Sequence, residues 1–140
     1  MTAGKLARHC RSVILSAAHS RALLPKATTV ILLAHGSTNE TASRIAAERL
    51  ADRVRQSQCF RNTRIALLEE GPSLAEVIAE TREPIIVVGL FAGEGMHGLD
   101  DMRRLVTELG CDDIFLLRPV GTFAGIDAIV SAAVTNSCQL

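Results

Sequence analysis

Two histidines and an adjacent pair of glutamates are the side chains of this sequence whose types and positions best suit chemistry. His35 follows a short apolar run, and His97 lies in a glycine-punctuated stretch beyond another such run. Glu69 and Glu70 follow a third apolar run. Neutral imidazoles and a carboxylate suit a borderline transition metal such as cobalt, nickel, iron or zinc. We therefore interpret these residues as a candidate metal site, provided that the fold brings the three segments together.

Each of these residues, taken alone, has a simpler structural interpretation. A histidine at the end of a strand is commonly a hydrogen-bonded structural residue, and adjacent loop glutamates are commonly solvated charges. Asp100 and Asp101 stand where a helix should begin, which is a favourable place for acidic residues. The functional interpretation therefore depends on whether the segments converge.

The elements that must position these residues alternate along the chain. The run from Ile85 to Val88 is uninterrupted and apolar, which is typical of a strand buried on both faces of a parallel sheet. The patterns predict strands over residues 30–33, 63–68, 85–88 and 114–117, and helices over 40–56, 72–81, 99–109 and 123–134. This alternation predicts an α/β three-layer sandwich with a four-stranded parallel sheet and right-handed crossovers. The commonest small arrangement is a flavodoxin-like strand order, 2-1-3-4.

That strand order would bring the candidate residues to one crevice. The first and third strands are then neighbours, and their crossovers leave in opposite directions, so a crevice opens at their carboxyl ends. We expect His35 and His97 to face one another there, with Glu69 or Glu70 nearby. Other motifs are absent, because there is no GxGxxG after the first strand, no phosphate-binding P-loop, no GxSxG and no HExxH.

The composition favours one packed globular domain and excludes several classes of partner. The chain has 140 residues, 48% of them hydrophobic, and a formal net charge of zero, so no overall field would attract an anion. It has no Trp or Tyr, so base stacking and a nucleic-acid partner are not expected. No apolar run is long enough for a membrane span. The four cysteines form no CxxC pair, which is typical of reduced thiols in a cytoplasmic protein.

The first 27 residues differ from the rest of the chain. Residues 1–39 contain five Lys or Arg and no acidic residue. Apolar residues from Val13 to Leu24 roughly follow helical spacing, and Pro25 would stop such a helix. An organelle transit peptide and a start codon placed too far upstream are alternative interpretations. We favour an N-terminal extension over 1–27, either a mobile helix or a packing arm, followed by an α/β domain over 28–140.

Three motifs, each at the end of a predicted strand, together resemble those of a known family. They are ILLAHGS over residues 31–37, LLE over 67–69 with PSL over 72–74, and VGLF over 88–91 leading to His97 and Asp101. In this order they resemble the short, single-domain CbiX-type sirohydrochlorin cobaltochelatases, over residues 28 to 135 or so.

The resemblance implies a chelatase-like domain that inserts a divalent metal into a sirohydrochlorin-type tetrapyrrole, in cobalamin or siroheme biosynthesis. Cobalt is the expected metal, iron and nickel are possible, and no organic cofactor is implied. The family's two metal-handling histidines fall on His35 and His97, and its acidic residue falls on Glu69. The segment between that acid and Pro72 is one residue short, so Glu70 is the alternative acid. Short members form homodimers, which is the assembly expected here.

Metal insertion suggests roles for these residues. Two protons must leave the pyrrole nitrogens while the ion sheds water, and a neutral imidazole can both bind a metal and accept a proton. Activity should therefore fall as His35 and His97 become protonated at low pH.

Small residues next to the histidines are expected to contact the macrocycle. Glycine lets the backbone approach a flat ligand closely, and amides at the start of a helix can receive carboxylates. These residues are Gly36, Ser37, Gly93 and Gly95. The competing interpretations are a non-catalytic metal- or tetrapyrrole-binding protein of the same fold, and a structural α/β domain with incidental histidines.

Overall fold

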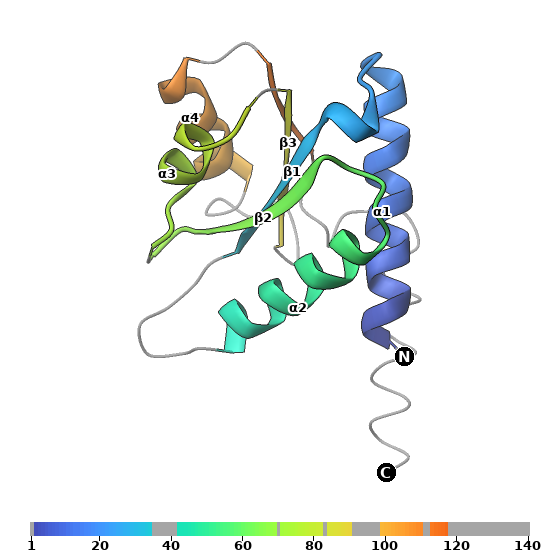
Figure 1. Cartoon of the computed structure of the whole chain (residues 1–140). Helices are drawn as coiled ribbons and strands as arrows, with labels where there is room; N and C mark the ends of the chain where they lie inside the picture. Colours follow the sequence, from blue (N-terminus) through green and yellow to red (C-terminus); the bar gives the residue numbers. More distant parts are fainter. Residues whose placement is uncertain are drawn as a thin grey trace.

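The computed structural model of the chain describes residues 2–34, 42–69, 71–82, 84–90, 99–110 and 113–117. Helices and strands alternate after a first long helix (Figure 1). The elements are α1 (Thr2–Ser20), the 3-10 helix η1 (Pro25–Ala27), β1 (Thr29–Ala34), α2 (Ala42–Gln56), β2 (Asn62–Leu67), α3 (Leu74–Ala79), β3 (Ile85–Gly89), α4 (Leu99–Leu109) and β4 (Ile114–Leu116).

The four strands form one parallel sheet in the order β2-β1-β3-β4. Both the parallel pairing and the strand order 2-1-3-4 predicted from the sequence are confirmed. β1 is a central strand, with Thr29 paired to Asn62 of β2 on one side and to Ile85 of β3 on the other. Each strand agrees with its predicted span to within one residue at either end. The predicted helix 123–134 lies outside the described residues.

Among the described helices, α1 and α2 cover one face of the sheet and α3 and α4 cover the other, which gives the predicted three layers (Figure 1). Side chains of a strand point alternately to the two faces, so β1 and β3 contribute to two separate apolar clusters. One cluster joins α1 and α2 to Val30, Leu32, Ile86 and Val88. The other joins α3 and α4 to Ile31, Leu33, Ile85 and Val87. Because every residue of β1 and β3 is buried, both strands read as unbroken apolar runs rather than alternating ones.

Helix α1 packs on the sheet beside α2 and not apart from it (Figure 1). Its residues Ala7, Cys10, Ile14 and Ala18 recur at helical spacing and are all buried in the first of these clusters. Of these four residues, Cys10, Ile14 and Ala18 are fully shielded from solvent. The segment is therefore a packed layer of this structure.

The end of α1 differs from the sequence expectation of a helix reaching Leu24. The helix ends at Ser20 because the backbone turns into a left-handed conformation at Ala22, with φ of 55°. The Leu23 amide donates to the Ala18 carbonyl at 2.8 Å, and the Ala22 amide donates to the His19 carbonyl at 3.1 Å. This pair of bonds is the Schellman motif, which satisfies carbonyls of the last helical turn.

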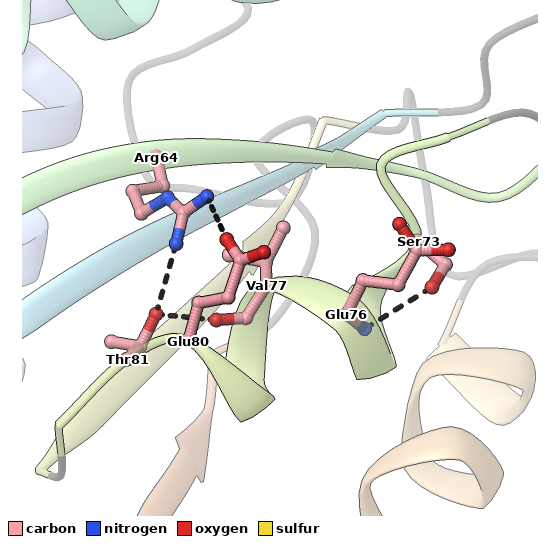
Figure 2. Close-up of polar contacts among 6 residues, drawn as sticks. All are labelled: Arg64, Ser73, Glu76, Val77, Glu80 and Thr81. Atoms are coloured by element: carbon pink, nitrogen blue, oxygen red, sulfur yellow. Dashed lines mark hydrogen bonds and ion pairs between the residues drawn. The ribbon is translucent and has the colours of Figure 1, made fainter.

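Helix α3 is shorter than its predicted span of 72–81. Ser73 is the N-cap, and its side chain accepts a hydrogen bond from the Glu76 amide at 3.2 Å, so the helix begins at Leu74 (Figure 2). At the other end the Thr81 hydroxyl donates to the Val77 carbonyl. Helix α4 matches its predicted span and is followed by Gly110 in the left-handed region, at φ of 65°.

Candidate functional site

The carboxyl ends of β2, β1 and β3 lie side by side at one edge of the sheet. Ala34 at the end of β1 pairs with Leu67 at the end of β2, and Leu33 pairs with Gly89 at the end of β3. Hydrogen bonds continue just beyond the strands, since the Leu68 amide donates to the Ala34 carbonyl at 3.0 Å. The three segments that carry the sequence-predicted residues therefore leave the sheet together. We call this the carboxyl edge.

The crossovers after β1 and β3 leave to opposite faces. The chain goes from β1 to α2, whose residues Leu50, Ala51 and Val54 join the cluster on one face. It goes from β3 to α4, whose Leu105 and Val106 pack against the cluster on the other face. Adjacent parallel strands whose crossovers diverge in this way form the switch point at which α/β proteins bind ligands.

The described residues that lie beneath this switch point are apolar. Ala34, Ala47 of α2 and Leu67 form a small buried cluster, and Leu90 packs against it. The Leu90 amide donates to the Leu33 carbonyl at 2.8 Å, which fixes the backbone leading out of β3. A ligand at this edge would therefore rest on the ordered ends of the strands.

Glu69 is the one sequence-predicted site residue that falls within the described residues. It lies two residues beyond the end of β2, at the carboxyl edge, and its side chain is exposed. An exposed carboxylate at this place is accessible to a cation from solvent. The other predicted residues lie outside the described residues, and they are His35, Gly36, Ser37, Glu70, Gly93, Gly95 and His97.

Within the described part of the chain, no three His, Cys, Asp or Glu side chains gather as a metal-binding group. Burial raises the pKa of the Cys10 thiol from 9.0 to about 12. The thiolate is the form that binds metals, so Cys10 stays protonated and is no ligand near neutral pH. None of the described helices is both long and apolar enough to cross a bilayer.

Sequence reasoning missed two cavities at the opposite edge of the sheet, where β1 and β2 begin. One has a volume of about 440 Å³ and is lined by residues that include Lys26, Arg55 and Arg61. The other measures about 260 Å³ and shares Arg61 with the first. The cations come from separate segments at no regular spacing, so no motif in the sequence could have grouped them.

Comparison with known families gives one match that covers most of the chain. The model of the CbiX family matches residues 29–137. The match includes β1 to β4 and begins after α1. Comparison with curated proteins found no match.

Several solved structures share the fold. CbiX described as the terminal enzyme for biosynthesis of siroheme in denitrifying bacteria is 25% identical, with a TM-score of 0.81. A CbiX protein from Marinobacter aquaeolei, described as putative in cobalamin (vitamin B12) biosynthesis, is 26% identical with a TM-score of 0.60. SirB from Bacillus subtilis, solved with Fe3+, is 14% identical with a TM-score of 0.75, which shows likeness of fold alone.

The solved structures differ in how much of their own length this chain matches. The chain spans 57% of the siroheme CbiX and 53% of SirB, little more than half of either. These matches cover 94% and 91% of this chain, and they therefore extend into α1. The Marinobacter protein is matched over 98% of its length but covers 80% of this chain. Helix α1 thus lies outside the family match and partly inside the matches to the longer proteins.

Proposed function

Because the chain belongs to the CbiX family, we propose that it inserts a divalent metal ion into a sirohydrochlorin-type tetrapyrrole. Cobalt is the first candidate metal and iron the second, in cobalamin or siroheme biosynthesis in the cytoplasm. The observation that carries the proposal is the shared carboxyl edge of β2, β1 and β3, which the family match includes. The metal and the tetrapyrrole are both substrates, and no organic cofactor takes part.

In this proposal His35 and His97 follow β1 and β3 and bind the incoming ion from the two sides of the switch point. As the ion moves to the macrocycle, each neutral imidazole can accept one of the two pyrrole protons. Glu69, exposed beyond β2, attracts the cation and helps to remove a proton. Gly36, Ser37, Gly93 and Gly95 would contact the macrocycle.

The direct test follows insertion into sirohydrochlorin by absorbance, with Co2+ and Fe2+ in parallel. We expect turnover above the non-enzymatic background, faster with cobalt, and loss of at least tenfold in kcat for His35→Ala and for His97→Ala. His19→Ala is the matched control because His19 is exposed near the end of α1, away from the carboxyl edge. Background rates with both metals would refute the proposal, and tight metal binding without turnover would favour the non-catalytic alternative.

A pair of variants decides which carboxylate acts. We expect Glu69→Gln to raise the KM for metal and lower kcat, and Glu70→Gln to leave both near wild type. Glu108→Gln, at an exposed position of α4, controls for the loss of one negative charge. If Glu70→Gln carries the defect instead, the acid of the site is Glu70.

The pH profile tests the protonation state of the histidines. Protonated imidazole binds no metal and accepts no proton, so kcat/KM should fall as the pH is lowered and recover when it is raised. A profile that is flat from pH 5 to 8 would remove both histidines from proton transfer.

We also propose that the chain acts as a homodimer, as the short-family resemblance implies. Sedimentation at micromolar concentration should give twice the mass of the 15.0 kDa chain. A monomer with full turnover would show that one chain suffices.

A further inference from the structure

The two cavities at the amino ends of β1 and β2 lie on the opposite edge of the sheet from the proposed chelatase site. They share Arg61 and Asn62, so they are neighbouring parts of one concave surface. We call the larger one, lined among others by Lys26, Arg55, Gln58, Arg61 and Asn62, the amino-edge cavity. Its volume of about 440 Å³ is in the range of small-molecule sites.

Three cations from three different segments line the amino-edge cavity. Lys26 comes from η1, Arg55 from the last turn of α2, and Arg61 from the connection between α2 and β2. None of the described residues that line this cavity is acidic. On a chain with zero net charge, such a group is a local concentration of positive charge in a concave place, which favours an anion.

Arg55 is held in place by other parts of the protein. Its Nε donates to the Thr63 carbonyl at 2.7 Å, and its Nη1 donates to Asp52 Oδ1 at 2.7 Å. The Nη2 group takes part in neither contact and retains its donors. A guanidinium that is already ordered loses little conformational entropy on binding a ligand.

Lys26 and Arg61 make no ion pair among the described residues, and both are exposed. The position of Arg55 has a structural explanation, because a cation is favoured at the carboxyl end of a helix. Arg61 lies beyond the end of α2 and its backbone amide donates to the Thr28 carbonyl at 2.9 Å, so that explanation does not extend to its side chain.

Gln58 contributes a further polar side chain to the amino-edge cavity. It adopts the left-handed conformation, with φ of 56°, two residues after the end of α2, where glycine is the favoured residue. A glutamine there is strained, yet it places a side-chain amide on the lining of the amino-edge cavity. Ala22 adopts the same conformation after α1, so it is the place of the Gln58 side chain on the cavity lining that bears on binding.

We propose that the amino-edge cavity binds a small multivalent anion, one that carries two or more phosphate or carboxylate groups. Lys26 and Arg61 supply exposed positive charge, Arg55 supplies a fixed guanidinium, and Gln58 supplies a hydrogen-bond donor. The site is separate from the carboxyl edge, so its occupancy does not depend on the proposed chelatase activity.

The neighbouring cavity is a weaker anion site. Arg64 lines it, but its Nη2 donates to Glu80 Oε2 at 2.8 Å and its Nη1 donates to the Thr81 hydroxyl at 3.5 Å (Figure 2). The carboxylate of Glu80 itself lines this cavity, whereas Asp52, which pairs with Arg55, does not line the amino-edge cavity. The amino-edge cavity is therefore the main site.

The test uses the full chain and isothermal titration at constant ionic strength, with inorganic pyrophosphate as one probe and tricarballylate as the other. We expect saturable one-site binding of at least one probe. The tighter probe tells whether phosphate or carboxylate groups are preferred. Arg61→Gln and Lys26→Gln should each weaken binding at least fivefold. Arg103→Gln, exposed on α4, is the control and should bind like wild type.

Two glycine variants separate strain from binding. Gln58→Gly and Ala22→Gly both relieve a left-handed residue, so both should raise the melting temperature. We expect Gln58→Gly alone to weaken anion binding. The proposal is overturned if neither probe binds saturably, if Arg61→Gln and Lys26→Gln bind like wild type, or if Arg103→Gln loses as much affinity as they do.

Discussion

At the scale of single residues, burial fixes the chemistry of Cys10. Its thiol is fully shielded from solvent, and its pKa of about 12 in the folded protein lies above the ordinary value of 9.0. The unfolded chain therefore releases this proton near pH 9 while the folded chain keeps it. The contribution of this protonated thiol to the free energy of unfolding is fully present below pH 9 and is lost as the pH rises from 9 towards 12.

Comparison of the wild type with Cys10→Ala measures this effect. We expect the free energy of unfolding of the wild type to fall relative to that of Cys10→Ala between pH 9 and 10.5, by urea titration at each pH. The two curves should stay parallel between pH 7 and 8.5. Parallel curves over the whole range would show that Cys10 has an ordinary pKa in the folded state.

Gln58, the left-handed residue after α2, gives a second prediction at the scale of single residues. The left-handed conformation disfavours a side chain by about 1–2 kcal/mol, and glycine gives back about 0.5–1 kcal/mol through its freedom in the unfolded chain. Gln58→Gly should thus stabilise the fold by roughly 0.5–1 kcal/mol. Thermal unfolding checks the sign, with Ala46→Gly at an exposed position inside α2 as a control that should destabilise.

At the scale of elements, α1 depends on one narrow buried face. Ile14 is fully buried against the sheet. Ile14→Ala should destabilise the protein by about 2–5 kcal/mol, because it removes packed apolar volume and leaves a cavity. Ser12→Ala, at an exposed position two residues earlier, should change the free energy of unfolding little. Equal stability of both variants would mean that α1 contributes nothing to the fold in solution.

The N-cap of α3 can be tested in the same way. Ser73→Ala removes the acceptor for the Glu76 amide and should lower stability by about 0.5–2 kcal/mol. Ser73→Asp keeps an acceptor at this place and should retain most of the stability. The comparison is made by urea unfolding, and loss in both variants would point to a role of Ser73 other than capping.

The elements and most of their ends were predictable, but the ends of the helices α1 and α3 were not. The strands were found because β1 and β3 are buried on both faces and so read as apolar runs. The ends of α1 and α3 were misplaced because they are set by a Schellman motif at Ala22 and a serine cap at Ser73. Such hydrogen bonds cannot be read from the pattern of apolar residues on which the prediction relied.

At the scale of the whole molecule, the strand order was the step that mattered for the candidate site. Once β1 lies between β2 and β3, the segments after all three must meet at one edge. The placement of Glu69 at this edge follows from the sequence pattern, and the roles of His35 and His97 stay predictions. The amino-edge cavity could not be predicted, because Lys26, Arg55 and Arg61 meet only through the tertiary fold.

The shared cluster of α1, α2 and the sheet predicts that they unfold together. Ile14 and Ala18 lie in the same cluster as Leu32 and Val88. Amide hydrogen exchange should therefore give protection in the middle of α1 close to that of β1. Exchange of α1 at a much lower free energy than β1 would show that the helix detaches while the sheet stays folded.

The position of α1 has a practical consequence for anyone who trims this protein to its family-matched segment. A fragment starting at residue 29 would leave part of the sheet bare of the helix that packs on it in the intact chain. Apolar strands laid open to water invite self-association. We expect such a truncated product to accumulate as insoluble aggregate on expression, whereas the intact polypeptide stays dispersed, and a simple centrifugation of the two lysates would tell them apart.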